Sequence, residues 1–394
     1  MSGRGPLYLD YAATTPVDPR VAARMAAALT AEGVFGNPAS LHAFGRAARA
    51  LVEQARVQVA ALVGARPQQL TFTSGSTEAA NLALLGFVRG ARARAGSAAV
   101  HVITSRTEHK AVLDPCRQLE REGCTVTWLT PGEGGCVTPA QLAQALRPAT
   151  VLVALMHANN ETGHIQDVAA CGALCRAHGA ALFVDASQSA GKLAIDVEAM
   201  GIDLLALTAH KFYGPKGSGA LYAGDSRRGL IQPLLHGGGH ERGLRSGTLA
   251  THQIVGLGAA SELAMRSREA GQARLAALRA RLWAGLADLP GVLQNGSAGQ
   301  CLPGILNVSF PGVEGESLVA GLAELAVSTG AACNSDSDEP SYVLRALGRD
   351  RESAQSSLRF SLGQPTSEAD IDLAIAAVRR EVLRLRAVAG LACA

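Results

Sequence analysis

The sequence LFVDASQ, residues 182–188, is a short apolar run that ends in the carboxylate of Asp185. The sequence ALTAHK, residues 206–211, is a second such run and leads to the amine of Lys211. Short apolar runs of this kind are typical of strands buried on both faces of a parallel sheet. Because ligands of such sheets bind beyond the carboxyl ends of the strands, we expect Asp185 and Lys211 to emerge at the same edge.

The same pattern of strands and helices extends outward from these two runs. Strands are predicted at residues 100–104, 125–129, 151–156, 181–185 and 204–208. Helices with apolar residues three to four positions apart are predicted at residues 21–29, 47–63 and 168–178. Strands that alternate with helices indicate an α/β fold with a mostly parallel sheet covered by helices on both faces.

The pattern changes after a long Ala/Arg-rich helix predicted at residues 259–286. Beyond it follow a predicted strand at 306–310, a loop rich in Ser, Asn and Asp at 328–340, and a last helix at 368–386. We therefore predict two domains. The large domain comprises residues 17–264, and a smaller α+β domain combines residues 1–16 with 265–394 and carries the polar loop.

Composition excludes several classes of function. The chain has 394 residues, of which 48% are hydrophobic, so it can bury a large core. Its 36 cations and 33 anions are interleaved, and without a basic block we expect no direct binding of nucleic acid. The start of the sequence lacks the apolar core of a signal peptide, and no apolar run reaches membrane-spanning length. We expect a cytoplasmic protein with no membrane partner.

The eight cysteines do not form zinc-like CxxC pairs, so no metal site is expected. Cys171 and Cys175 are four residues apart and could share a helix face, where core packing is favoured over metal binding. Cysteine usually behaves as a small buried hydrophobe, and this interpretation is applied to every cysteine except Cys333. Cys333 instead lies in the polar 328–340 loop, which suits a nucleophile that must reach an acceptor.

The stretch TFTSGSTE, residues 71–78, leads from a predicted strand into the start of a helix. Gly75 permits a tight turn, and the hydroxyls of Ser76 and Thr77 lie beside free N–H groups at the positive end of the helix. Such a helix start can bind a phosphate, although an ordinary helix cap has the same residues. No Walker motif or GxGxxG accompanies it, which disfavours nucleoside triphosphates and dinucleotides.

Only four lysines occur in the chain, Lys110, Lys192, Lys211 and Lys216. Arginine stays protonated, so any amine that must lose its proton is one of these four. A phosphate-binding turn, a strand-end acid and a strand-end lysine together fit one cofactor, pyridoxal 5'-phosphate. Its phosphate would occupy the turn, Asp185 would pair with the ring nitrogen, and Lys211 would form the Schiff base.

Longer motifs add a family resemblance. They are LDYAATTP (9–16), GNPAS (36–40), TEHKA (107–111), MHANNETG (156–163), GGHERGLRSGT (238–248), STGAAC (328–333), EPSYVLRALG (339–348) and SLRFSLG (357–363). In this order, over residues 7–375, the chain resembles cysteine desulfurases of the IscS/NifS type in the class V aminotransferase family. The resemblance implies a pyridoxal-phosphate-dependent transferase of fold type I.

The resemblance also implies roles around the cofactor ring. Lys211 would hold the cofactor and move the Cα proton, and Asp185 would pair with the pyridine nitrogen. Gln188 would reach the phenolic oxygen, and His109 would stack on the ring. The residues expected at the phosphate are Ser76, Thr77, Thr208, His210 and, from the second subunit of a homodimer, Thr248.

The implied substrate is L-cysteine, whose carboxylate would be held by Asn160 and Arg359. Arginine suits this task because its planar fork can bind a carboxylate with two hydrogen bonds. Cys333 would attack the substrate sulfur, which gives a Cys333 persulfide and L-alanine. The persulfide sulfur would then pass to a protein acceptor that serves iron–sulfur cluster assembly, tRNA thiolation or DNA phosphorothioation.

Some features depart from the family pattern, and other functions stay open at this stage. His240 stands where the family commonly has Gln, and Asp336 and Asp338 make the cysteine loop more acidic than usual. Residues 383–394 do not resemble the tail that IscS-type enzymes use to dock an iron–sulfur scaffold. A selenocysteine lyase, another class V enzyme, and an inactive partner-binding subunit are the alternatives.

Overall fold

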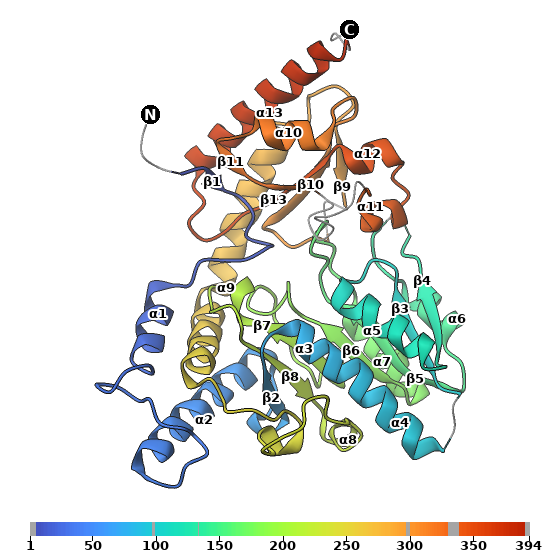
Figure 1. Ribbon diagram of the computed structural model, residues 1–394. Helices are drawn as coiled ribbons and strands as arrows, with labels where there is room; N and C mark the ends of the chain where they lie inside the picture. The colour runs from blue at the N-terminus through green and yellow to red at the C-terminus, as the bar shows by residue number, and fades with distance from the viewer. Residues whose placement is uncertain (1–4, 97–98, 133, 297–299, 330–338, 391–394) are drawn as a thin grey trace.

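The structure is a computed structural model that describes residues 5–96, 99–132, 134–296, 300–329 and 339–390. Its main features are two sheets that lie one above the other, joined by a long helix (Figure 1). Cys333, Asp336 and Asp338 lie outside the described residues.

The larger sheet has seven strands in the order β2-β8-β7-β6-β5-β3-β4. Their bounds are β2 Leu70–Thr73, β3 His101–Ser105, β4 Thr125–Leu129, β5 Thr150–Met156, β6 Ala181–Asp185, β7 Leu204–Thr208 and β8 Gly219–Ala223. All neighbours pair in parallel except β8, which is antiparallel to both β7 and β2. The predicted mostly parallel α/β sheet is therefore confirmed.

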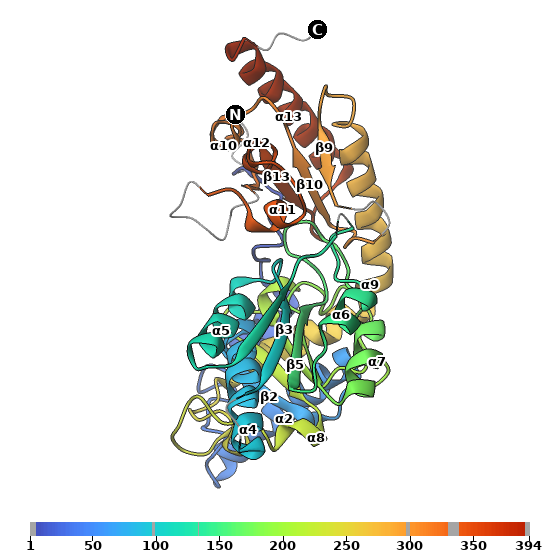
Figure 2. The same ribbon diagram turned by 90° about the vertical axis from the view of Figure 1, so that its right-hand side faces the viewer.

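Helices cover both faces of this sheet. Successive residues of each strand point to opposite faces, and since the central strands are apolar on both faces, both faces must be covered. In β6, Leu182 and Val184 face a core shared with α2, α7 and α9, whereas Ala181 and Phe183 face a core shared with α3, α4 and α5. Figure 2 shows α5 on one side of β3 and β5 and α7 on the other. Cys171 and Cys175 of α7 are fully buried in the first core, as the core-packing interpretation predicted.

The smaller sheet is antiparallel, with four strands in the order β12-β13-β10-β9. Their bounds are β9 Leu293–Asn295, β10 Ile305–Ser309, β12 Ser328–Thr329 and β13 Ser357–Ser361. Beside it, β1 (Leu7–Tyr8) pairs in parallel with β11 (Leu325–Ala326), so the N-terminal segment joins the small-sheet part of the chain here. The core between this sheet and α13 is lined by Leu306, Val308, Phe360, Ile371 and Val378.

The helices complete the two layers. Around the large sheet they are α1 Pro19–Ala26, α2 Ala43–Val63, α3 Ser76–Asn81, a π-helical turn η2 Leu82–Gly86, α4 Phe87–Ala95, α5 Lys110–Arg121, α6 Pro139–Ala145, α7 Val168–His178 and α8 Asp225–Arg228, with short 3₁₀ turns η1 Pro67–Gln69, η3 Ala209–Lys211 and η4 Glu241–Gly243. Around the small sheet they are α10 Gly315–Gly321, α11 Tyr342–Ala346, α12 Arg351–Gln355 and α13 Glu368–Val388. No helix in the described ranges is long and apolar enough to cross a membrane.

One helix, α9 (Thr251–Ala284), runs along both sheets. Its first half buries residues such as Ile254 and Leu257 in the large core, and its last part buries Leu278 and Leu282 in the small core. None of its residues from 265 to 274 is buried. The helix that the sequence predicted at 259–286 begins eight residues earlier in the structure, at Thr251, because the apolar face that starts there packs on α2.

The remaining differences from prediction are local. Ser328–Thr329, placed by the sequence in a loop, forms β12 because its backbone pairs with β13. The antiparallel strand β8 and the π-helical turn η2 are not evident from the apolar pattern.

Candidate functional site

The candidate site is a cavity of about 300 Å³ at the carboxyl edge of the large sheet, on the side of the small sheet. Nine of the residues singled out by sequence line it, namely Ser76, Thr77, His109, Asn160, Asp185, Gln188, His210, Lys211 and Arg359. Ala12, Ala13, Met156, Ala158 and Ser187 complete the lining.

Asp185 and Lys211 come from neighbouring strands. Asp185 is the last residue of β6, and Lys211 ends the 3₁₀ turn η3 that directly follows β7. One oxygen of Asp185 accepts hydrogen bonds from the backbone N–H of Ser187, at 2.9 Å, and from its hydroxyl. The carboxylate is only 6% exposed, so it needs a positively charged or N–H partner in the cavity.

The N-terminal segment 8–14 covers the amine of Lys211. The Lys211 Nζ donates to the backbone carbonyls of Ala12, at 2.5 Å, and Ala13, at 2.8 Å. Gln188 Nε2 donates to the same Ala12 carbonyl at 2.8 Å, and Lys192 Nζ donates to Gln188 Oε1 at 3.0 Å. The two partly buried lysines are therefore joined through Gln188 and one backbone carbonyl.

His109 is the N-cap of α5, and this role fixes its position at the wall of the cavity. Its Nδ1 accepts a hydrogen bond from the backbone N–H of Ala111 at 3.1 Å. Burial lowers the pKa of His109, and the positive charge of Lys211 acts in the same direction, while Asp185 opposes them. A neutral imidazole with its proton on Nε2 satisfies these contacts and presents a flat apolar face.

The turn between β2 and α3 has the geometry of an anion cradle. Gly75 takes a φ of 155°, and no side chain caps the first N–H groups of α3. β8 passes so close that a Cβ on Gly219 would lie 2.7 Å from the Cα of Gly75, so both positions favour glycine. The free N–H groups of α3, together with the hydroxyls of Ser76 and Thr77, fit a phosphate group.

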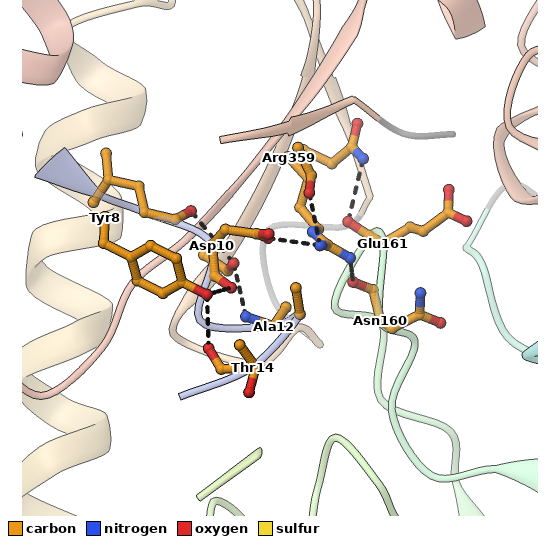
Figure 3. Close-up of polar contacts among 12 residues, drawn as sticks. Tyr8, Asp10, Ala12, Thr14, Asn160, Glu161 and Arg359 are labelled. Atoms are coloured by element: carbon orange, nitrogen blue, oxygen red, sulfur yellow. Dashed lines mark hydrogen bonds and ion pairs between the residues drawn. The ribbon is translucent and has the colours of Figure 1, made fainter. Parts of the chain in front are cut away.

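Arg359 enters the cavity from the small sheet, on β13 (Figure 3). Its Nη1 donates to the carbonyl of Asn160 at 2.8 Å, and its Nη2 donates to Asp10 Oδ1 at 2.7 Å. Its Nε–H is buried and has no hydrogen-bond partner among the described residues. A buried guanidinium with a spare donor fits a carboxylate ligand.

Two predicted phosphate residues do not line the cavity. Thr208 ends β7 but is buried, and its hydroxyl donates to the carbonyl of Ser218 at 3.3 Å. Thr248 is exposed, in a segment that two ion pairs fix to the rest of the chain. Arg245 bonds Glu78 of α3 at 2.8 Å, and Glu241 bonds Arg56 of α2 at 2.8 Å.

The sequence alone did not single out Asp10, Lys192 and Glu161 for this region. Burial, together with the charges of Lys211 and Arg359, lowers the pKa of Lys192 to about 7. Burial also raises the pKa of Glu161 to about 7, while Ser341 and Arg359 oppose that shift. The scarcity of lysine marked Lys192, but nothing in its local sequence placed it beside Gln188.

The donor set fits pyridoxal phosphate as expected from the sequence. The cavity offers an anion cradle, an acid positioned at the end of β6, a lysine amine and a flat neutral imidazole. No group of three or more His, Cys, Asp or Glu side chains in the described part of the chain is placed to hold a metal ion.

Comparisons with known proteins agree with this geometry. The family model "Aminotransferase class-V" matches residues 7–373. Cysteine desulfurase IscS of Salmonella schwarzengrund is 55% identical over 97% of this chain and 94% of its own length, and that of Psychromonas ingrahamii is 54% identical over the same shares. The match covers nearly the whole of both proteins.

Solved structures show the same fold. A NifS-like protein, 34% identical, superposes with a TM-score of 0.87 over 95% of this chain and 98% of its own. SspA, solved in complex with cysteine, is 37% identical with a TM-score of 0.79 over 90% and 98% of the two chains. The chain therefore belongs to the class V aminotransferases, a pyridoxal-phosphate-dependent family, and within them to the IscS-type cysteine desulfurases.

Proposed function

We propose that the chain is a cysteine desulfurase that converts L-cysteine to L-alanine and collects the sulfur as a persulfide on Cys333. The observation that carries this proposal is the convergence of Asp185 and Lys211 of the large sheet with Arg359 of the small sheet in one cavity. Similarity to IscS proteins over almost the full length supports it, as does the relative SspA, which was solved with cysteine.

The cofactor is held by groups from several elements. The cradle formed by Ser76, Thr77 and the start of α3 binds the phosphate, and His210 lies beside it. Asp185 pairs with the ring nitrogen, Gln188 faces the phenolic oxygen and His109 stacks on the ring. The bound cofactor supplies an electron sink that makes the Cα–H and Cβ–S bonds of the substrate easier to break. We assign Thr208 an indirect role, as a residue that shapes the cradle from behind.

The chain's own groups orient the substrate and move its proton. The guanidinium of Arg359, with the side chain of Asn160, binds the carboxylate of L-cysteine. The contacts of Arg359 with Asp10 and the Asn160 carbonyl fix the direction of its free Nε–H. Lys211, once its amine is free, takes the proton from Cα and returns it to the product.

Sulfur transfer balances without an external oxidant. The thiolate of Cys333 attacks the substrate sulfur, an S–S bond forms and the Cβ–S bond breaks. The electron pair of that bond remains with the carbon skeleton, which takes up protons and leaves as L-alanine. The persulfide then passes its outer sulfur to a protein acceptor, whose identity is open because the tail at 383–394 differs from scaffold-docking tails.

We further propose a homodimer with two cytoplasmic active sites. Residues 29–44, which lie mostly between α1 and α2, expose Leu29, Phe35, Leu41 and Phe44, and this segment extends from the body in Figure 1. Exposed apolar groups of this kind mark protein interfaces. We assign Thr248, which is exposed, to the phosphate site of a second subunit. The division into a large domain at 17–264 and a small one at 1–16 with 265–394 is supported by the separate cores.

The test is production of sulfide and alanine from L-cysteine with a reductant, for wild type beside Cys333→Ser. Absorption is recorded first, since bound cofactor gives a band near ~400 nm. We expect wild type to make both products, and we expect Cys333→Ser to keep the cofactor band but to make neither product. Equal activity of the two proteins would exclude Cys333 as the nucleophile, and activity on L-selenocysteine alone would indicate a selenocysteine lyase.

A further inference from the structure

Both flanks of residues 330–338, the stretch that contains Cys333, attach to residues of the candidate site. On the N-terminal side, Ser328 of β12 pairs with Arg359 of β13. The guanidinium of Arg359 also donates to the Ser328 hydroxyl at 3.2 Å. The chain that leads to Cys333 is therefore fixed to the arginine that we assign to the substrate carboxylate.

On the C-terminal side, two hydroxyls make the attachment. The Ser341 hydroxyl donates to the carboxylate of Glu161, and the Tyr342 hydroxyl donates to the backbone carbonyl of Glu108 at 2.7 Å. Glu161 directly follows Asn160, and Glu108 directly precedes His109. The chain that leaves the cysteine stretch is therefore bound to the two segments that carry a substrate residue and the ring-stacking residue.

The Ser341–Glu161 contact is buried and directional. Both residues are at most 4% exposed. Ser341 also caps α11, since its oxygen accepts from the backbone N–H of Leu344 at 3.1 Å. A hydroxyl has one proton, so with the oxygen engaged at the helix that proton is donated to Glu161.

The backbone of Glu161 is held in place independently of Ser341. Its backbone N–H donates to Asn159 Oδ1 at 2.9 Å, and its carbonyl accepts from Asn307 Nδ2 at 3.2 Å. The backbone of Glu161 therefore gives Ser341 a fixed segment to attach to, and the carboxylate makes the attachment through its hydrogen bond with the Ser341 hydroxyl. Burying a carboxyl with few partners costs stability, which argues for a use beyond packing.

We propose that Glu161, Ser341 and Tyr342 are positioning residues for the sulfur-transfer step, because they fix the chain beyond Cys333 to the segments that bind cofactor and substrate. This inference rests on the proposed desulfurase function. Cys333 is four residues after Thr329 and eight before Ser341. A fully extended chain spans 3.3–3.6 Å per residue, so Cys333 can lie at most ~14 Å from Thr329 and at most ~28 Å from Ser341. Within that reach, the second attachment fixes the direction in which the chain leaves Cys333, so its loss spreads the thiol over more positions and lowers its effective concentration at the substrate sulfur.

The experiment compares Tyr342→Phe, Ser341→Ala and Glu161→Met with wild type in a single turnover, because a methionine at 161 has no oxygen to accept from the Ser341 hydroxyl. Persulfide on the Cys333 peptide is followed by rapid quench and mass spectrometry. Binding of L-cysteine is followed separately, by the change in cofactor absorption. Ser367→Ala is the matched control for Ser341→Ala, because Ser367 caps α13 in the same way but lies away from the cavity. Tyr222→Phe on β8 is the control for loss of a tyrosine hydroxyl.

We expect the three variants to form persulfide about 5- to 10-fold more slowly, which corresponds to one buried hydrogen bond. The concentration of L-cysteine that half-saturates the absorption change should stay within about twofold. Ser341→Thr, which restores the hydroxyl, should restore the rate. Tyr342→Phe removes a single oxygen, so it still tests the inference if the substitutions at Ser341 or Glu161 disturb folding.

Three results would overturn the inference while the desulfurase function stands. In the first, the variants form persulfide as fast as wild type. In the second, their binding of L-cysteine weakens by the same factor as the persulfide rate. In the third, the Ser367→Ala control loses as much of the persulfide rate as Ser341→Ala. If wild type itself forms no persulfide on Cys333, the proposed function fails and the positioning role fails with it.

Discussion

Replacement of Arg359 by lysine tests the two-sheet construction of the site most directly. The guanidinium makes three hydrogen bonds within the chain, to Asn160, Asp10 and Ser328, and its buried Nε–H has no partner among the described residues. A lysine ammonium keeps the positive charge but has three donors and no planar fork. It cannot satisfy the structural contacts and also bind a carboxylate with two bonds.

The size of the effect follows from the hydrogen bond that is lost. A hydrogen bond to a charged group contributes about 1.5–3 kcal/mol. At about 1.4 kcal/mol per tenfold, Arg359→Lys should raise the KM for L-cysteine by about 10- to 100-fold. Because the contact is made to the carboxylate, which does not react, we expect kcat to change much less.

The assay is steady-state alanine formation over a range of L-cysteine concentrations, after the cofactor band has been shown to be intact. Arg279→Lys is the matched control. Arg279 lies on α9, donates to the carbonyl of Ile305 at 2.7 Å and does not line the cavity. A KM within twofold of wild type in a fully coloured Arg359→Lys variant would refute the assignment of the substrate carboxylate to this residue.

Further predictions concern the cofactor lysine and two buried charges. Lys211→Arg should abolish the band near ~400 nm in a spectrum of the purified protein, because a guanidinium forms no Schiff base. Arg56→Met should lower the free energy of unfolding, measured in urea, by about 3–5 kcal/mol, because the Glu241 carboxylate (2% side-chain exposure) would be buried without its charged partner. The double variant Arg56→Met with Glu241→Leu should lose less of this free energy than Arg56→Met alone. The pKa of Lys192 is lowered from 10.5 to about 7, so between these pH values the unfolded chain binds one more proton than the folded chain. Wild type should therefore gain stability relative to Lys192→Met from pH 7 to pH 9, and parallel urea curves would contradict this.

The sequence predicted those parts of the fold that depend on local pattern. Strands 125–129, 181–185 and 204–208 agree with β4, β6 and β7, and the mostly parallel sheet follows from their alternation with helices. The same geometry explains why Asp185 and Lys211 could be expected at one edge. In the structure both line one cavity.

Features that depend on distant pairing were not predictable in this way. Asp10 reaches Arg359 only because segment 8–14 crosses between the two sheets, and 349 residues separate the pair. Ser328–Thr329 forms a strand because β13 offers its edge, although the residues themselves favour a loop. Lys192 and Glu161 acquire their shifted pKa values from burial by elements far away in the sequence.

The long helix α9 has a mechanical consequence for the site. Lys211 belongs to the large sheet and Arg359 to the small one, and the helix packs into both cores while residues 265–274 bury no side chain between them. Gly271 lies in this stretch, and glycine lowers the bending stiffness of a helix because it contributes no side-chain contacts. The spacing between the amine and the guanidinium, and so the size of amino acid that fits between them, therefore depends on the curvature of this helix as well as on direct contacts such as that of Arg359 with the Asn160 carbonyl.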